Sequence, residues 1–279
     1  MKVNAGNIKV IVCDLDGTLL NNQKLISPGN LRAVNAARER GIFVTICTGR
    51  IPEMTEAYIR FLGIQGPVIM ANGAAIIDTR DNSVPYRECS DNDQAAKLLE
   101  FCAERGFDHI AAAVEGCYYS RNSKRIERFT QYNSIAQKEN MKQMSLVLLD
   151  DYSVIKKLNI YKLLIAGLSK DQQNEVEAYV ETLPDLGHTS SEQGLLDVGA
   201  AEVNKGNGVR NLARVMGISA DEICVFGDFH NDVPMFEAAV FSVAMGNADE
   251  SVKKSASYIT KTNDEDGVAA AIEKYFLGG

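Results

Sequence analysis

Two aspartates, Asp14 and Asp16, stand two residues apart directly after an apolar run, in the stretch VCDLDGTLL. Asp-Gly is a common turn dipeptide, so taken alone the pair is explained equally well by a turn. Carboxylates also serve as nucleophiles and as general acids or bases. At the end of a strand, side chains two residues apart project to the same side. The pair therefore predicts either a turn or a catalytic site, and the rest of the chain has to decide between them.

Further polar groups follow other predicted elements: Thr48 and Gly49, then Lys205, then Asp228, Asn231 and Asp232. In a doubly wound sheet, ligands bind beyond the carboxyl ends of the strands, so we expect these groups to meet at one edge. A lysine at the start of a helix opposes the helix dipole, and an anion facing it would explain its position. Individually, the threonine could bond its own backbone and the acids could cap a helix. Together the groups favour a site over isolated turns.

These residue types fit metal-assisted phosphoryl transfer. Several carboxylates suit a hard divalent cation, Mg²⁺ before others, and we find no His or Cys cluster with metal-ligand spacing in the sequence. A carboxylate nucleophile forms an acyl phosphate, and a second carboxylate transfers the proton of the leaving oxygen. Thr48 supplies a hydroxyl and Lys205 a positive charge for the phosphoryl oxygens.

The elements that must position these residues alternate between strand and helix. Apolar strand-like runs end at Asp14, at Thr48 and at Asp228, and helical patterns separate them. The first helix is expected over residues 27–41, with Ser27 as N-cap and Pro28 at its first position. Continuous apolar strands joined by helices indicate a parallel sheet covered on both faces. The predicted fold class is α/β, with a Rossmann-like, doubly wound parallel-sheet core.

The rhythm breaks in the middle of the chain, where strands are weaker and tyrosine is more frequent. We therefore predict an inserted α+β domain over residues 84–186, within a discontinuous core of residues 1–83 and 187–279. Polar hinges are expected near residues 80–90 and 184–190. The segment 67–77 is expected to be one further strand with a turn at Asn72-Gly73.

At this point the sequence resembles the haloacid dehalogenase superfamily of phosphatases. The stretch DLDGT at 14–18 is similar to the first motif of that family, and TGR at 48–50 is similar to the second. Lys205 and GDFHND at 227–232 are similar to the third and fourth. The long insertion resembles the large α/β cap, of C2 type, in the Cof-type subfamily. NGA at 72–74 also looks like that subfamily, as do MGNA at 245–248 and TNDEDGVA at 262–269.

The resemblance implies a role for each acid. Asp14 would be the nucleophile and a metal ligand. Asp16 would be the general acid and base, with its backbone carbonyl on the metal. Asp228 would be a metal ligand, and Asp232 would support the metal shell and Lys205. The implied cofactor is Mg²⁺.

The resemblance also implies a phosphate-binding set. Thr48 and Lys205 would hold the transferring phosphoryl group, helped by the backbone of Leu15 and Gly49. Asn231 would contact the phosphate. The implied function is hydrolysis of a small phosphorylated metabolite, such as a sugar, nucleotide or coenzyme phosphate, through an aspartyl-phosphate. A phosphomutase using the same intermediate, or a phosphate-binding protein without turnover, would be the alternatives. The acid/base Asp16 argues against pure binding.

The composition of the chain limits the kinds of partner and the cellular location that we expect. The net charge of −8 makes nucleic acid a poor partner, because basic patches supply most of that affinity. A membrane helix needs about 18 consecutive apolar residues, and we find no such run in the sequence. The first residues lack the apolar core of a signal peptide, so a cytoplasmic protein is expected. The cysteines lack a C-x-x-C pair. The chain is expected to be a monomer or a homodimer.

Overall fold

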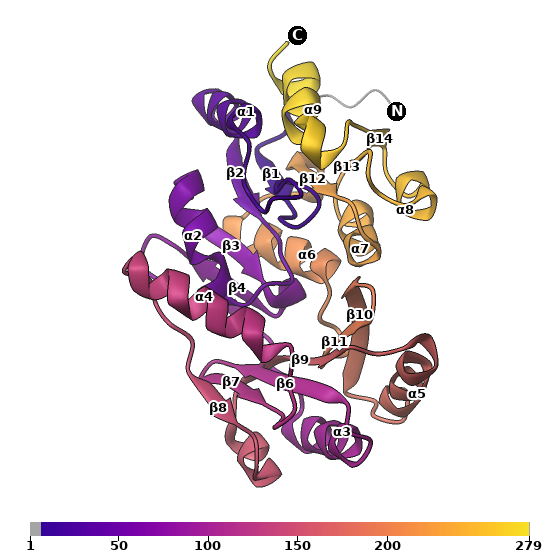
Figure 1. Cartoon of the computed structure of the whole chain (residues 1–279). Coiled ribbons are helices and arrows are strands. Elements are labelled where there is room, and N and C mark those ends of the chain that lie inside the picture. The colour runs from indigo at the N-terminus through magenta and orange to yellow at the C-terminus, as the bar shows by residue number, and fades with distance from the viewer. Residues whose placement is uncertain (1–6, 279) are drawn as a thin grey trace. The chain divides into compact units, whose positions relative to one another are not determined.

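The computed structural model describes residues 7–278 (Figure 1). Residues 1–6, on which the expectation about a signal peptide mainly rests, lie outside that range. By contacts between Cα atoms the described chain divides into two compact units. The first unit comprises residues 7–49, 62–86 and 204–278, and the second comprises residues 50–61 and 87–203. The domain boundaries predicted from the sequence, at 84 and 186, stay a prediction.

The first unit is built on a parallel sheet. Its strands are β1 (Val10–Cys13), β2 (Phe43–Ile46), β12 (Ile223–Gly227), β13 (Phe241–Ala244) and β14 (Tyr258–Ile259). Their order across the sheet is β14-β13-β12-β1-β2, and each neighbouring pair is parallel. The strand order reverses at β1, with β2 on one side and β12 on the other. The predicted α/β class with a parallel core is confirmed.

Helices cover this sheet on both faces. They are α1 (Pro28–Glu39), α6 (Lys205–Met216), α7 (Val233–Glu237), α8 (Glu250–Lys254) and α9 (Gly267–Phe276). Val10 and Val12 share one apolar cluster with residues of α6 and α7. The alternate side chains, Ile11 and Cys13, project to the opposite face and are completely buried. Helices α1 and α9 lie side by side (Figure 1), and the Ala269 N–H donates to Asn30 Oδ1 at 2.9 Å.

The start of α1 forms as predicted. Ser27 is its N-cap, the Ser27 hydroxyl accepts a hydrogen bond from the Asn30 N–H, and Pro28 occupies the first turn. Local hydrogen bonding thus fixes the entry to the helix, because a capping side chain satisfies a backbone donor that the helix leaves open.

Short 3₁₀ turns also occur in the described chain. They include η2 (Ala71–Gly73), η3 (Tyr152–Lys157), η4 (Ala220–Glu222), η5 (His230–Asp232) and η6 (Asn263–Glu265).

The segment expected to be one strand is a hairpin instead. Strand β3 (Pro67–Met70) pairs antiparallel with β4 (Ala75–Asp78), and β5 (Tyr86–Arg87) follows β4 in the same sheet. The predicted turn at Asn72-Gly73 is present, but it reverses the chain, because Asn72 (φ 57°) and Gly73 (φ 101°) both have positive φ. A β-bridge between Cys47 and Ile69 continues the parallel direction of β2.

The second unit is a largely antiparallel sheet with helices. Its strands are β6 (Asp108–Ala113), β7 (Gly116–Tyr119), β8 (Leu146–Leu148), β9 (Ile160–Ala166), β10 (Leu186–Glu192) and β11 (Leu195–Ala200). Their order is β10-β11-β9-β6-β7-β8, and β8 joins β7 in parallel. The helices are α2 (Pro52–Leu62), α3 (Asn92–Glu104), α4 (Ile126–Lys138) and α5 (Lys170–Val180). One apolar cluster includes residues of α3 and α5, and another includes Phe129 of α4.

The polar hinge predicted at residues 184–190 is wrong. Strand β10 begins at Leu186, and it pairs antiparallel with β11 from Leu186 opposite Ala200. Gly194, at φ +72°, lies in the turn that joins the two strands. This strand was not predicted from the sequence because most of its side chains are polar. Its backbone hydrogen bonds to β11 make it a strand, and its own residue pattern does not reveal them.

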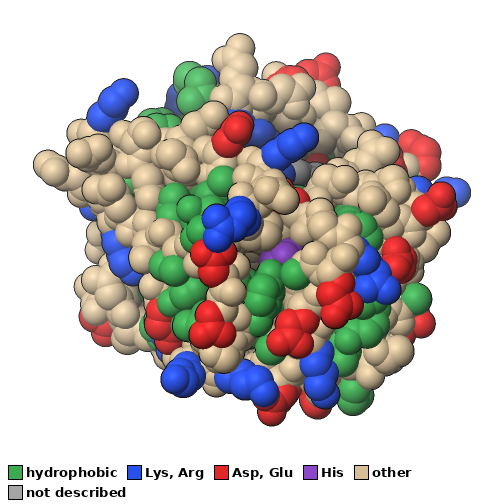
Figure 2. Space-filling model, turned by 60° about the horizontal axis from the view of Figure 1, so that its bottom comes forward, with side chains coloured by type: hydrophobic (Ala, Val, Ile, Leu, Met, Phe, Trp, Pro, Cys, Tyr) green, Lys and Arg blue, Asp and Glu red, His purple; other side chains and the backbone are tan. Residues whose placement is uncertain are grey.

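The surface and the helices bear on possible partners. Within residues 7–278, no helix combines the length and the apolar character that crossing a bilayer requires. On the face shown in Figure 2, Lys and Arg side chains lie among Asp and Glu side chains. That face therefore carries charge of both signs.

Candidate active site

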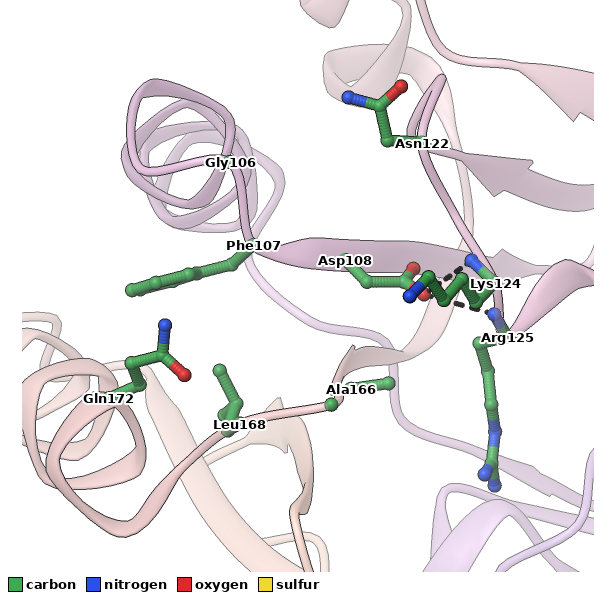
Figure 3. A pocket seen from close by; sticks show the side chains of 10 residues that line it. Gly106, Phe107, Asp108, Asn122, Lys124, Arg125, Ala166, Leu168 and Gln172 are labelled. Atoms are coloured by element: carbon green, nitrogen blue, oxygen red, sulfur yellow. Dashed lines mark hydrogen bonds between the residues drawn. The ribbon is translucent and has the colours of Figure 1, made fainter.

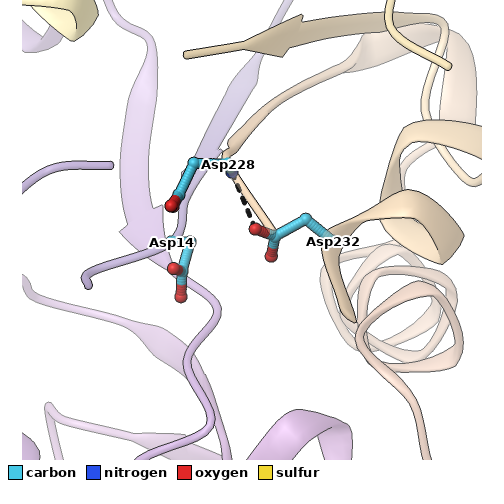
Figure 4. Close-up of side chains that lie close together, drawn as sticks. All are labelled: Asp14, Asp228 and Asp232. Atoms are coloured by element: carbon cyan, nitrogen blue, oxygen red, sulfur yellow. Dashed lines mark hydrogen bonds between the residues drawn. The ribbon is translucent and has the colours of Figure 1, made fainter. Parts of the chain in front are cut away.

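The carboxyl ends of β1 and β12 place two aspartates side by side. These strands are parallel neighbours, with Cys13 opposite Phe226, and the Asp14 N–H donates to the Phe226 carbonyl at 2.9 Å. Asp14 follows β1 directly and Asp228 follows β12 directly. Asp14, Asp228 and Asp232 each offer a carboxylate oxygen within 4.8 Å of the others (Figure 4). The sheet edge predicted from the sequence therefore gathers these three acids.

Lys205 lies between two of these carboxylates. It is the first residue of α6, only 1% exposed, and its Nζ is 2.8 Å from Asp14 Oδ1 and 2.5 Å from Asp232 Oδ1. Burial opposes the charge of Lys205, but attraction to Asp14 and Asp232 outweighs it and raises the pKa of the ammonium above its ordinary value. A charged lysine is therefore built into the interior of the site.

Two acids of the cluster, Asp14 and Asp228, have raised pKa values and resist ionisation. Burial raises the pKa of Asp14 well above its ordinary value, with Asp232 and Asp228 adding to the shift while Lys205 opposes it. Burial, and then the charge of Asp232, raise the pKa of Asp228 to about 7, although a hydrogen bond from Thr18 works against the rise. One lysine does not balance three carboxylates. The possible ligand atoms are all carboxylate oxygens, which suit a hard divalent cation. Such a cation would balance the negative charge that Lys205 leaves uncompensated.

Asp232 is engaged through both of its oxygens. Oδ1 meets Lys205, and Oδ2 accepts hydrogen bonds from the N–H groups of Asp228 (2.8 Å) and Phe229 (3.0 Å). Gly227 makes room for this arrangement, because a Cβ at that position would lie 2.5 Å from the Asp232 side chain. Asp232 thus holds the loop after β12 and the lysine in place.

The loop after β1 contacts Asp228 closely. The Thr18 hydroxyl donates to Asp228 Oδ1 at 2.7 Å. Gly17 has φ +84°, and a Cβ there would lie 2.2 Å from Asp228 Oδ2. The Asn247 amide donates to the Gly17 carbonyl at 2.9 Å. The contacts of Thr18 and Asn247 were not predicted. The only sequence signals were their places in DLDGT and in MGNA.

Asp16 does not belong to the three-acid cluster defined by Asp14, Asp228 and Asp232. Its Oδ1 accepts from Lys24 Nζ at 2.8 Å, and its side chain is 33% exposed. Leu15, between the two aspartates, has a completely buried side chain, and its carbonyl accepts from the Leu20 N–H at 2.8 Å. Side chains that are adjacent in the motif therefore face different surroundings, and the contact with Lys24 was not predicted.

Thr48, Gly49 and Asn231 gather around Asn72, which the sequence placed in a turn and in the NGA motif but not among the site residues. The Thr48 carbonyl accepts from the Asn72 N–H at 3.0 Å, and Asn231 Nδ2 donates to Asn72 Oδ1 at 3.2 Å. A Cβ at Gly49 would lie 2.9 Å from Asn72 Oδ1. The second and fourth motifs are thus linked through Asn72, while Thr48 itself is buried.

A separate pocket of about 530 Å³ lies within the second unit (Figure 3). Asp108, Lys124 and Gln172 are among the residues that line it. Asp108 Oδ2 accepts hydrogen bonds from the backbone N–H groups of Lys124 (2.8 Å) and Arg125 (3.0 Å), just before α4. The acid in this pocket is therefore engaged by the chain itself, as a cap for the segment entering α4.

The fold and this sheet edge define a known class of enzyme. The sequence model of the haloacid dehalogenase-like hydrolases matches residues 11–272, and the chain belongs to this family. It is a phosphatase of that family. The chain is 30% identical to the 5-amino-6-(5-phospho-D-ribitylamino)uracil phosphatase YwtE of Bacillus subtilis, over 97% of this chain and 99% of the relative. It is also 30% identical to the phosphatase YwpJ of the same organism, over 94% and 98%.

Solved structures of similar proteins have the same fold as this chain. A haloacid dehalogenase-like hydrolase from B. subtilis superposes with a TM-score of 0.83 at 28% identity, covering 95% of this chain and 99% of that one. A hydrolase of the same description from Bacteroides thetaiotaomicron gives a TM-score of 0.81 at 29% identity, covering 96% and 100%. The predicted family is confirmed.

Proposed function

We propose that this chain is a Mg²⁺-dependent phosphomonoester hydrolase that works through an aspartyl-phosphate on Asp14. The observation that carries the proposal is the buried lysine between two acids, at 2.8 Å from Asp14 and 2.5 Å from Asp232, with Asp228 beside them. Burial shields the Asp14 carboxylate from solvent, and the contact with Lys205 fixes its position. A site for binding alone would not require a general acid and base such as Asp16.

The metal would be held by the oxygens of Asp14 and Asp228 and by the Asp16 carbonyl. Asp232 would hold Lys205 and the backbone of Asp228 in place rather than bind the metal directly, because both of its oxygens already accept hydrogen bonds from the chain. When bound, Mg²⁺ supplies positive charge to the phosphoryl oxygens. Lys205 adds to that charge, and the Thr48 hydroxyl and the backbone N–H groups at Leu15 and Gly49 would complete the phosphate site.

In the first step, a carboxylate oxygen of Asp14 attacks phosphorus while the bond from phosphorus to the ester oxygen breaks. Asp16 gives its proton to that oxygen, and the alcohol leaves. In the second step, water attacks the phosphorus of the aspartyl-phosphate, and Asp16 takes one proton from it. The bond between Asp14 and phosphorus breaks, so inorganic phosphate is released and Asp14 is restored.

The substrate is proposed to be a small phosphorylated metabolite. The relatives YwtE and YcsE are named 5-amino-6-(5-phospho-D-ribitylamino)uracil phosphatases, and a relative from Methanosarcina acetivorans is named phosphoglycolate phosphatase. These compounds share a phosphate monoester on a small carbon skeleton. We propose that the inserted domain predicted over residues 84–186 determines which skeleton is accepted.

The test is phosphate release from p-nitrophenyl phosphate and from a panel of phosphorylated metabolites, in Mg²⁺ and in EDTA. Release is expected only with the metal, and Asp14→Asn should abolish it. The matched control is Asp221→Asn, which removes an exposed carboxylate of the same unit and should leave the rate unchanged. If Asp14→Asn kept full activity and the melting temperature of the wild type, the assignment of Asp14 as the nucleophile would be wrong. Equal rates in EDTA would overturn the metal dependence.

A further inference from the structure

Asn72 lies at the tip of the β3–β4 hairpin and links two parts of the site. It is buried, with 4% of its surface exposed. Its N–H donates to the Thr48 carbonyl at 3.0 Å, and its Oδ1 accepts from Asn231 Nδ2 at 3.2 Å. Asn231 is 159 residues away in the chain. One residue, through its backbone on one side and its side chain on the other, thus joins the segment after β2 to the segment after β12.

The backbone at this turn adopts an unfavourable conformation. Ala71 has φ +51° and Asn72 has φ +57°, and both carry a Cβ. Residues with a Cβ rarely adopt this region, although Asn tolerates it better than most. Gly73 presses against the start of α6, because a Cβ there would lie 2.4 Å from the Asn204 carbonyl oxygen. Strained backbone of this kind persists where the surroundings hold it, and it concentrates at functional sites.

The hydrogen bond to Asn72 decides which end of the Asn231 amide faces an anion. An amide has a carbonyl oxygen that repels phosphate and an NH₂ group with two donors. Asn72 Oδ1 takes one N–H of Asn231, which fixes the nitrogen on this side and directs the second N–H to another acceptor. Gly49 permits the close approach, since a Cβ there would lie 2.9 Å from the same oxygen.

We propose that Asn72 is a positioning residue for phosphoryl transfer: it orients the Asn231 amide so that its second N–H binds the transferring phosphoryl group. This inference rests on the proposed function, because it assigns the phosphate contact to Asn231. The Asn72 side chain acts through Asn231, whereas the bond to the Thr48 carbonyl comes from the Asn72 backbone and is kept when the side chain is removed. Its loss should therefore cost no more than the loss of the amide that it orients.

The test is a double-mutant cycle with p-nitrophenyl phosphate. Asn72→Gly removes the side chain while keeping a residue that tolerates φ +57°. We expect kcat/KM to fall about tenfold in Asn72→Gly and in Asn231→Ala, as for a lost hydrogen bond to a charged group. The double variant should be within about twofold of Asn231→Ala alone, because coupled residues are not additive. The matched control is Asn82→Gly, at an exposed Asn with φ +60°, which should leave kcat/KM unchanged.

A second variant, Asn72→Asp, keeps the inference testable if Asn72→Gly fails to fold. Asn72→Asp keeps an acceptor oxygen for Asn231, so Asn231→Ala should still cost about tenfold in that background. Multiplicative losses in the Asn72→Gly cycle, or an Asn72→Gly variant as active as the wild type, would overturn the inference. So would an Asn231→Ala change without effect in the Asn72→Asp background. Asn231→Ala without effect in the wild type would also overturn it. Asp14→Asn in the same assay separates the two claims, since residual activity there counts against the proposed function instead.

Discussion

Replacing Lys205 by Met tests the charge balance at the centre of the site. Met keeps an unbranched side chain of similar length but removes the ammonium. Asp14 and Asp232 then lose their partner at 2.8 and 2.5 Å, inside a region from which water is excluded. Removing one member of a buried ion pair costs about 3–5 kcal/mol, because the other charge is left uncompensated. We expect a loss of this size in the free energy of unfolding at pH 8 without metal.

The loss should depend on pH. Without the lysine, the folded-state pKa of Asp14 rises further above its unfolded value of 3.8. An acid with a raised folded pKa binds its proton more tightly in the folded state, so stability falls as pH rises from the unfolded to the folded value. The destabilisation of Lys205→Met should therefore be smaller at pH 5 than at pH 8. Added Mg²⁺ should restore part of it at pH 8, because the ion replaces some of the missing positive charge.

The measurement is urea unfolding of wild type and variant at both pH values, in EDTA and in Mg²⁺, together with phosphate release. Lys162→Met is the control, since Lys162 is buried in the second unit with its Nζ 2.6 Å from Asp197 Oδ1. Both variants should lose stability. Only Lys205→Met should lose catalysis, by at least about 100-fold, as expected when a charge contact to the phosphoryl group is removed. A Lys205→Met protein within about 1 kcal/mol of wild type at pH 8 would refute the reasoning, because that loss lies well below the range for a broken buried pair.

Three further outcomes follow from particular contacts. Gly17→Ala should weaken Mg²⁺ binding at least about tenfold by calorimetry, because its Cβ would lie 2.2 Å from Asp228 Oδ2; Gly41→Ala, with φ +82° and open space around it, should keep the wild-type affinity. Mg²⁺ should raise the melting temperature of the wild type, and Asp228→Asn should remove most of that rise; an undiminished rise would exclude Asp228 as a ligand. His109 is 1% exposed and its Nε2 lies 2.8 Å from the Tyr152 hydroxyl. Burial lowers its pKa below 6.5, so the unfolded state gains protons first and stability should fall as pH drops below 6.5. Urea unfolding at pH 7.5 and 5.5 should show this slope in wild type and a shallower one in His109→Gln; equal slopes would contradict it.

The sequence by itself determined the elements that carry the site. Ser27 and Pro28 start α1 through local bonds, and apolar runs of four or five residues became β1, β2 and β12. Asp14 and Asp228 could be placed together because the carboxyl ends of parallel strands meet at one edge. These features depend on spacing along a short stretch of chain, which is legible without the tertiary structure.

Only the tertiary structure decided which partner each polar group takes. Thr18 bonds Asp228 across 210 positions, and Asn72 bonds Asn231 across 159. Strand β10 was missed because its pairing with β11, rather than its own pattern, makes it a strand. Asp16 faces Lys24 although its neighbour in the motif, Asp14, faces Lys205. Such contacts depend on how distant segments pack, and a buried polar group takes the partner that packing brings within reach, because leaving it unbonded is costly.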